Sequence, residues 1–178
     1  MGRDKATLML SDGRTLLARA IHTLKAAGAS EILISVRQGQ TYAFPDTREI
    51  VDSFDNCGPL AGLATSIEAA RNEQVLIMAV DLPAMPSEYL RKLIALSTTT
   101  CGVVPFRENF FEPLVAIFPR QAAPFAFNAL NAGHFSLQPW IRELSDSKLI
   151  KPVEIEPPEI GFFINWNHPH DFPTAHSP

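Results

Sequence analysis

The sequence is poor in cysteine and has no long apolar run. Its two cysteines, Cys57 and Cys101, form neither a disulfide framework nor a Cys-x-x-Cys pair, so we expect reduced, partly buried thiols in a reducing compartment. The longest apolar stretch, residues 75–80, is far too short to cross a bilayer. No apolar segment typical of a signal peptide follows the first five residues. These absences predict a cytoplasmic protein with no membrane partner.

Runs of basic residues are also missing. The 15 lysine and arginine residues are scattered, the formal net charge is −4 and the pI is near 5.7. A protein that wraps nucleic acid normally carries a basic patch, so this charge balance argues against nucleic acid as a partner. An acidic protein can still bind a triphosphate, because backbone N–H groups, one lysine and a metal neutralise the phosphates locally.

The sequence does contain the composition of a folded domain and a regular alternation of elements. With 178 residues, 46% of them hydrophobic, it is long enough to bury a central sheet. We interpret residues 1–178 as one domain that ends in an extended tail at 171–178. The apolar spacing predicts helices over residues 15–27, 60–71, 86–97, 121–132 and 136–144, and strands over 31–36, 74–80, 101–105, 112–118, 152–155 and 161–164. This alternation predicts an α/β fold with a mostly parallel, doubly wound, Rossmann-like sheet and helices on both faces.

Such sheets bind ligands at the carboxyl ends of their strands, so polar residues that follow an apolar strand are the first candidates. Asp81 follows the run Val-Leu-Ile-Met-Ala-Val, and Pro83 ends that strand directly afterwards. A carboxylate at this position is a hard oxygen ligand, suited to Mg²⁺ that bridges phosphate oxygens. The alternative is an aspartate that caps the helix beginning near Pro86 or accepts from loop amides.

A glycine-rich turn precedes the second predicted helix, in the segment Gly58-Pro59-Leu-Ala-Gly62. Gly58 permits a positive φ, Pro59 favours the first helical turn, and Gly62 lets the helix N-terminus approach a ligand closely. The exposed N–H groups of such a turn suit the edge of a base or an anion, although for this motif alone a plain turn and cap is the simpler interpretation. Asp52, upstream of the turn, is a candidate acceptor for a ribose hydroxyl or a guanine edge, or else a solvated loop acid.

Polar residues near both ends of the sequence complete the candidate set. Lys5 is a flexible positive charge suited to phosphates, or an ordinary surface lysine. Asn165 and Asn167 follow the last predicted strand at i and i+2, so both side chains point to one side of the pleat, near a metal and a phosphate. Asx-turn chemistry before Pro169 is the alternative. The same segment has three residues at the spacing of zinc ligands: His168, His170 and Asp171. No second group of ligands in the sequence supports a zinc site, so a solvated tail is the preferred interpretation.

Together and in this order, these motifs resemble those of the MobA-like nucleotidyltransferase family, and in particular of its molybdenum cofactor guanylyltransferases. That family has a Leu-Ala-Gly-Gly loop leading into Arg-Met-Gly-x-Asp-Lys, a Gly-Pro-Leu-Ala-Gly turn, an Asp-x-Pro after a buried strand, and a closing Asn-x-Asn-x-Pro. This sequence has Met-Gly-Arg-Asp-Lys at 1–5, Gly-Pro-Leu-Ala-Gly at 58–62, Asp-Leu-Pro at 81–83 and Asn-Trp-Asn-His-Pro at 165–169. The match covers nearly the whole length, and four ordered motifs are far more specific than any one of them.

The resemblance implies transfer of GMP from GTP to the terminal phosphate of molybdenum-molybdopterin, with release of pyrophosphate and with Mg²⁺ as cofactor, and transient contact with other proteins of molybdenum cofactor biosynthesis. A phosphate nucleophile is already anionic and needs no general base, so catalysis is positioning and neutralisation of charge. The resemblance assigns Lys5, Ser35, Asp52, Gly58, Pro59, Gly62 and Asp81 to the nucleotide, Lys5 and Asp81 to catalysis, Asp81 to the metal, and Asn165 and Asn167 to the acceptor.

One family feature is missing from the sequence. The first strand and its glycine-rich loop would precede Met1, and the resemblance implies that this strand is central in the sheet and that its loop binds phosphates. We therefore expect little or no guanylyl transfer from the polypeptide as given. The alternatives are a relative with another nucleotide or acceptor, such as a molybdopterin cytidylyltransferase or a sugar-phosphate nucleotidyltransferase, and a non-catalytic nucleotide-binding remnant. The turn at 58–62 favours the guanylyl branch, and the retained Lys5 and Asp81 argue against a remnant.

Overall fold

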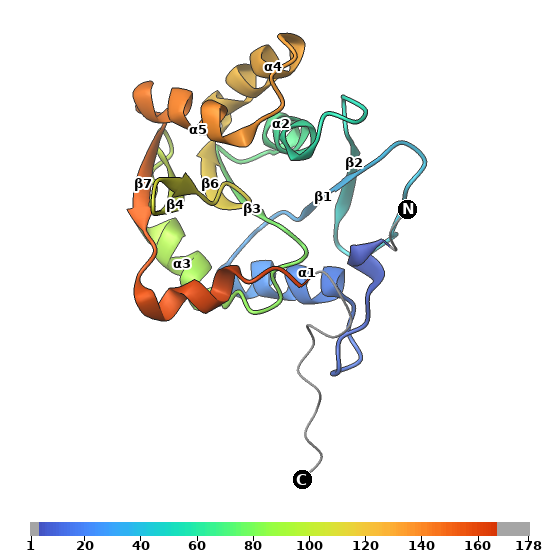
Figure 1. Cartoon of the computed structure of the whole chain (residues 1–178). Helices are drawn as coiled ribbons and strands as arrows, with labels where there is room; N and C mark the ends of the chain where they lie inside the picture. Colours follow the sequence, from blue (N-terminus) through green and yellow to red (C-terminus); the bar gives the residue numbers. More distant parts are fainter. Residues whose placement is uncertain (1–3, 167–178) are drawn as a thin grey trace.

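The structure, a computed structural model, describes residues 4–166 and places helices on both faces of a β-sheet (Figure 1). In chain order the elements, with η for a 3-10 helix, are η1 (Lys5–Thr7), α1 (Leu16–Ala27), β1 (Leu33–Val36), β2 (Arg48–Val51), α2 (Pro59–Ala69), β3 (Gln74–Met78), α3 (Ser87–Leu96), β4 (Gly102–Arg107), β5 (Phe110–Phe111), β6 (Val115–Pro119), η2 (Arg120–Ala122), α4 (Ala123–Asn131), α5 (Leu137–Asp146), β7 (Ile150–Glu154) and η3 (Pro157–Phe163). Helices α2, α4 and α5 lie on one face, and α1 and α3 lie on the other (Figure 1). The predicted α/β class is confirmed.

The sheet consists of two separate parts. β1 pairs with β2 in parallel, and the larger part has the order β3-β6-β4, with β5 and β7 also paired to β4. β7 runs parallel to β4, whereas β6 is antiparallel to both of its neighbours, an interruption of the parallel order that was not predicted. The cause is local, because Glu108 and Asn109 have φ of 50° and 66°, as in a type I′ hairpin turn. This turn reverses the chain from β4 into β5, and the chain then continues into β6.

Local sequence explains where the helices nearest the carboxyl strand ends begin and end. α1 begins after Thr15, whose hydroxyl oxygen accepts a hydrogen bond from the N–H of Ala18, and it ends at Gly28 with φ of 102°. α2 follows Gly58, which has φ of 69°, and carries Pro59 in its first turn. These ends agree with the predicted helices at 15–27 and 60–71 to within two residues.

Two apolar clusters hold the sheet between the helices. On one face, Trp140 of α5 packs on Phe118 of β6 with ring centroids 5.1 Å apart, in a cluster that includes Leu60 of α2. On the other face, Tyr89 of α3 packs edge-on against Phe163 of η3 with centroids 5.5 Å apart. Because both clusters are closely packed, the strand ends are held at fixed positions relative to α2.

The strand predicted at residues 161–164 is wrong, since residues 161–163 belong to η3 and Ile164 is its C-cap. That helix begins with Pro157 and Pro158, which have no N–H to donate to a strand neighbour. Glu156 and Glu159 accept each other's backbone N–H in a capping box, which favours the helical turn. β5 has only two residues, and β2 begins with the charged residues Arg48 and Glu49, so neither forms an apolar run and neither was predicted.

Within residues 4–166, no helix is long and apolar enough to cross a membrane. Both cysteines are free thiols. The predicted tail at 171–178 lies outside the described residues, as do Asn167 and the three residues at zinc-ligand spacing.

Candidate active site

A cavity of about 660 Å³ opens where β1 and β3 end and where α2 begins. The strands deliver polar residues to it because each strand ends in the cavity wall, which is the arrangement expected of an open α/β sheet. Six of the residues predicted from the sequence line this one cavity: Ser35, Asp52, Gly58, Pro59, Gly62 and Asp81.

Asp81 lies just beyond β3 and is held from two distant parts of the chain. Lys5 Nζ donates a hydrogen bond to Asp81 Oδ2 over 3.0 Å, and the two side chains are 41% and 20% exposed, respectively. The N–H of Trp166 donates to the backbone carbonyl of Asp81 over 2.9 Å. This bond places the segment that contains Asn165 beside Asp81. Asn165 itself is exposed. The structure therefore brings together three segments that the sequence separates widely.

Ser35 and Asp52 form a polar pair at another part of the same cavity. Ser35 lies near the carboxyl end of β1, and its hydroxyl donates a hydrogen bond to Asp52 Oδ1 over 2.5 Å. Asp52 follows β2 and is held by its N–H, which donates to the carbonyl of Val36 over 2.9 Å. A Cβ placed on Gly62 would lie 2.5 Å from Ser35 Oγ and 3.3 Å from Asp52 Oδ1, so only glycine leaves room for this pair.

The N-terminus of α2 lies at the wall of the cavity, which Gly58, Pro59 and Gly62 line. Gly58 provides no side-chain cap to the helix, so N–H groups of the first turn lack a side-chain acceptor at this end. Such a helix terminus carries a partial positive charge that favours anions and electron-rich edges. The cavity thus combines a carboxylate with its lysine, a hydroxyl–carboxylate pair and a helix N-terminus.

The sequence and the fold can be compared with known proteins at this point. The profile of the MobA-like NTP transferase domain matches residues 1–148. The chain belongs to the MobA-like NTP transferase family. A relative from Opitutus terrae named "Probable molybdenum cofactor guanylyltransferase" is 33% identical over 174 residues, which cover 96% of this chain and 86% of that relative. As a member of this family, the chain is a nucleotidyltransferase.

Two solved structures share the fold of this family member. Molybdopterin-guanine dinucleotide biosynthesis protein A from Archaeoglobus fulgidus has a TM-score of 0.69 and 20% identity over 96% of this chain and 87% of its own. The 2-C-methyl-D-erythritol 4-phosphate cytidylyltransferase of Thermus thermophilus has a TM-score of 0.70 and 18% identity over 94% of this chain and 89% of its own. Since these two are named for different nucleotides, the fold alone does not select the base.

Asp81 is the residue of this cavity that the strand-end position offers to a metal ion. Among the described residues, no group of three or more histidine, cysteine, aspartate or glutamate side chains is arranged to hold a metal. Mg²⁺ commonly binds to one or two carboxylates together with substrate phosphates and water, rather than in a cage made by the protein. The carboxylate of Asp81 suits a metal ion that takes its other ligands from substrate phosphates and water.

The structure also reveals functional candidates that the sequence reasoning missed. Arg37 follows β1 and lines the cavity, so the strand-end rule that selected Asp81 also selects this residue. Asp4 caps η1 by accepting the N–H of Ala6, and its Oδ2 accepts from Tyr42 Oη and Gln40 Nε2, both over 2.8 Å. No sequence signal indicates this second contact, because it joins residues that lie far apart in the chain.

The loop that carries Tyr42 is itself fixed. The carboxylate of Glu49 accepts the hydroxyl of Thr41 and the N–H groups of Tyr42 and Ala43, and these hydrogen bonds, the one from Thr41 first, lower the pKa of Glu49. Burial, and then the hydrogen bond to Asp4, raise the pKa of Tyr42, whose hydroxyl is protonated at neutral pH and donates to Asp4. The loop therefore provides a firm anchor for Asp4, the neighbour of Lys5.

Proposed function

We propose that this nucleotidyltransferase transfers GMP from GTP to the terminal phosphate of molybdenum-molybdopterin, releasing pyrophosphate, in the cytoplasm. The observation that carries the proposal is the single cavity that joins the Asp81–Lys5 pair to the Ser35–Asp52 pair. The first pair suits a metal-bound triphosphate, and the second suits a base or a ribose. The name of the Opitutus terrae relative supports guanine as the base and the molybdenum cofactor as the acceptor.

The residues divide between the two ends of the nucleotide. Ser35 donates to Asp52 Oδ1, which leaves Oδ2 to accept N–H groups from the guanine edge or hydroxyls from the ribose. Gly58 and Gly62 keep the α2 N-terminus close to the nucleotide. Lys5 neutralises phosphate charge, and in doing so its ammonium moves from Asp81 to the phosphates.

Asp81 would hold Mg²⁺, which would supply neutralisation of the phosphate charge. An oxygen of the acceptor phosphate forms a bond to the α-phosphorus while the bond from that phosphorus to the α–β bridging oxygen breaks, and pyrophosphate leaves with the bonding pair. Asn165 and Asn167 position the acceptor phosphate by donating from their amides. No residue has to remove a proton, since the acceptor phosphate is anionic at neutral pH.

Calorimetric titration of GTP and CTP in the presence of Mg²⁺ tests the nucleotide. We expect GTP to bind at least about tenfold more tightly, because cytosine offers one amino donor to Asp52 where guanine offers two adjacent donors. Tighter binding of CTP would contradict the assignment of GTP and would favour a cytidylyltransferase. Because little guanylyl transfer is expected from residues 1–178 alone, nucleotide binding rather than turnover carries this test. Failure of both nucleotides to bind would contradict the proposal.

The variant Gly62→Ala separates nucleotide binding from folding. Its new Cβ displaces the Ser35 hydroxyl from Asp52, so we expect GTP affinity to fall by about tenfold, the effect of one lost charge-assisted hydrogen bond. The melting temperature should stay the same or rise, because alanine is favoured over glycine inside a helix by about 1 kcal/mol. Gly161→Ala is the matched control, since a Cβ there meets no atom within 4 Å. Unchanged GTP affinity in Gly62→Ala would show that the Ser35–Asp52 pair does not take part in GTP binding.

The variant Tyr42→Phe tests whether Asp4 positions Lys5. It removes one of the two hydrogen bonds that Asp4 Oδ2 accepts, and we expect GTP affinity to fall about three- to tenfold, as for a bond worth about 1 kcal/mol. Thr47→Val removes a hydrogen bond of the same loop, to the carbonyl of Phe44, without touching Asp4, and should retain full affinity. An equal loss in both variants would show a general loosening of the loop and would contradict a specific role for Tyr42.

A further inference from the structure

Arg37 lines the candidate active site, and the proposed function so far gives it no role. Among the described residues of the cavity wall it is the only arginine or lysine, and its side chain is exposed. Within residues 4–166 its guanidinium takes part in no hydrogen bond and no ion pair. The donors of this side chain are therefore available to a ligand in the cavity.

The backbone of Arg37 is held in place by a tight turn. The N–H of Gln40 donates to the carbonyl of Arg37 over 3.0 Å, and Gly39 has φ of 78°, as a type II turn requires at its third residue. The side chain of Gln40 closes the turn, because its Oε1 accepts the N–H of Arg37 over 3.2 Å while its Nε2 donates to Asp4. The guanidinium therefore extends from a fixed point of the cavity wall.

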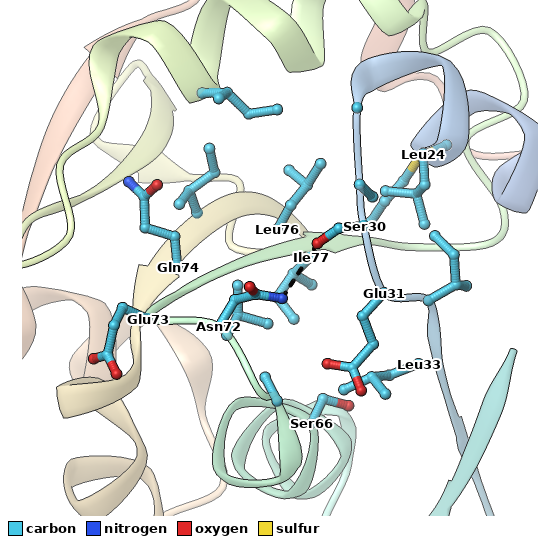
Figure 2. Close-up of a pocket in the computed structure, with 18 of the residues that line it drawn as sticks. Leu24, Ser30, Glu31, Leu33, Ser66, Asn72, Glu73, Gln74, Leu76 and Ile77 are labelled. Carbon is cyan, nitrogen blue, oxygen red and sulfur yellow. Dashed lines mark hydrogen bonds between the residues drawn. The ribbon is translucent and has the colours of Figure 1, made fainter.

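The pleat of β1 determines the direction of this side chain. Side chains two residues apart start on the same face of a strand, so Leu33, Ser35 and Arg37 share one face, and the residue between the last two, Val36, is buried. In Figure 2, Leu33 lies toward Ser66 of α2. Arg37 thus starts on the α2 side of β1.

The same face runs along α2 toward the start of that helix. A Cβ on Gly62 would touch the Ser35 hydroxyl, and Gly62 is one helical turn before Ser66. Two residues of a strand and four of a helix both advance by about 6–7 Å, so the next step along β1 brings Arg37 beside the first turn of α2. The guanidinium and the positive end of the α2 dipole therefore face one part of the cavity, which favours an electron-rich group there.

Asp52 lies next to this place and restricts what the electron-rich group is. β1 and β2 are parallel with Val36 opposite Val51, and the N–H of Asp52 donates to the carbonyl of Val36. Asp52 and Arg37 therefore follow neighbouring strand ends. A phosphate beside Arg37 would be repelled by the carboxylate of Asp52. An uncharged group that carries acceptors and donors side by side matches both residues, and a nucleobase is such a group.

We infer that Arg37 is a specificity-determining residue that recognises the acceptor edge of guanine. Its planar guanidinium donates two hydrogen bonds to O6 and N7, while Asp52 accepts from N1–H and the 2-amino group. Adenine has an amino donor in place of O6, so it would face the guanidinium with a donor against a donor. The inference rests on the proposed function, because it assigns Arg37 to the base of the same GTP.

The first test compares Arg37→Met with the wild-type chain by calorimetric titration in Mg²⁺. Methionine keeps an unbranched side chain of similar reach but has no donor. We expect GTP affinity to fall at least about tenfold, as for one lost bidentate contact, and ATP affinity to change less than about twofold. Arg142→Met is the matched control, since Arg142 is exposed on α5 and does not line the cavity. It should bind GTP as the wild-type chain does.

Nucleotide analogues identify the atoms of the base that Arg37 contacts. 7-Deaza-GTP has a C–H group in place of N7, so we expect the wild-type chain to bind it about three- to tenfold more weakly than GTP and Arg37→Met to bind the two equally. Inosine triphosphate keeps O6 and N7 but lacks the 2-amino group that Asp52 accepts. Its affinity relative to GTP should therefore be the same in both proteins.

The outcomes separate this inference from the proposed function. Unchanged GTP affinity in Arg37→Met would overturn the inference alone. An equal loss for GTP, ATP and inorganic triphosphate would also overturn it, because Arg37 would then contact phosphates rather than the base. Failure of the wild-type chain to bind GTP would contradict both the inference and the proposed function.

Discussion

Asp81→Asn is expected to remove the Mg²⁺-dependent part of GTP binding almost completely. Asparagine has nearly the shape of aspartate but is neutral, so the carboxylate that accepts from Lys5 loses its charge. We expect GTP affinity in Mg²⁺ to fall by about a hundredfold, since a metal contact contributes several kcal/mol. Any guanylyl transfer that the wild-type chain shows should be lost with it. Calorimetric titration of GTP with and without Mg²⁺ measures the effect.

This substitution should change the free energy of unfolding very little. The Lys5–Asp81 pair is partly exposed, and ion pairs of that kind contribute about 0–1 kcal/mol to stability. Asp46→Asn is the matched control, because Asp46 forms an exposed pair with Lys25 away from the cavity. If Asp81→Asn retained the same response to Mg²⁺ as Asp46→Asn, the metal would bind elsewhere and the proposed role of Asp81 would be wrong.

Gly102→Ala is expected to have the largest effect on stability. Gly102 lies in β4, and a Cβ there would overlap the backbone carbonyl oxygen of Ile117 and lie 3.0 Å from the Cα of Phe118. Because the obstacle is the backbone of β6 rather than a side chain that can rotate, the two strands must separate. We expect a loss of about 3 kcal/mol or more in the free energy of unfolding, at the upper end for overpacked cores.

Thermal unfolding measures this loss. For a chain of this size, about 3 kcal/mol corresponds to a decrease of roughly 6–12 °C in the melting temperature. The same substitution at Gly161, which has open space around it, should change the melting temperature by no more than about 2 °C. A wild-type melting temperature for Gly102→Ala would mean that β4 and β6 are not packed as described.

Most elements near the site could be predicted because their signals are local. Thr15 and Gly28 mark the ends of α1, Gly58 and Pro59 mark the start of α2, and a continuous apolar run marks β3. These signals depend on side chains within a few residues of one another. β5 has too few residues for such a signal, and two of the four residues of β2 are charged. At residues 161–164 a capping box and two prolines outweighed the apolar run.

The sequence by itself determined the family, the α/β class and the strand ends that supply Asp81 and Ser35, since chain order and local pattern are sufficient for each. Only the tertiary structure decided which of these residues meet. The Lys5–Asp81 bond, the Ser35–Asp52 pair beside Gly62 and the anchoring of Asp4 by Tyr42 all join distant segments. The pairing of the strands also belongs to the tertiary structure, because it depends on long-range hydrogen bonds that no local pattern encodes.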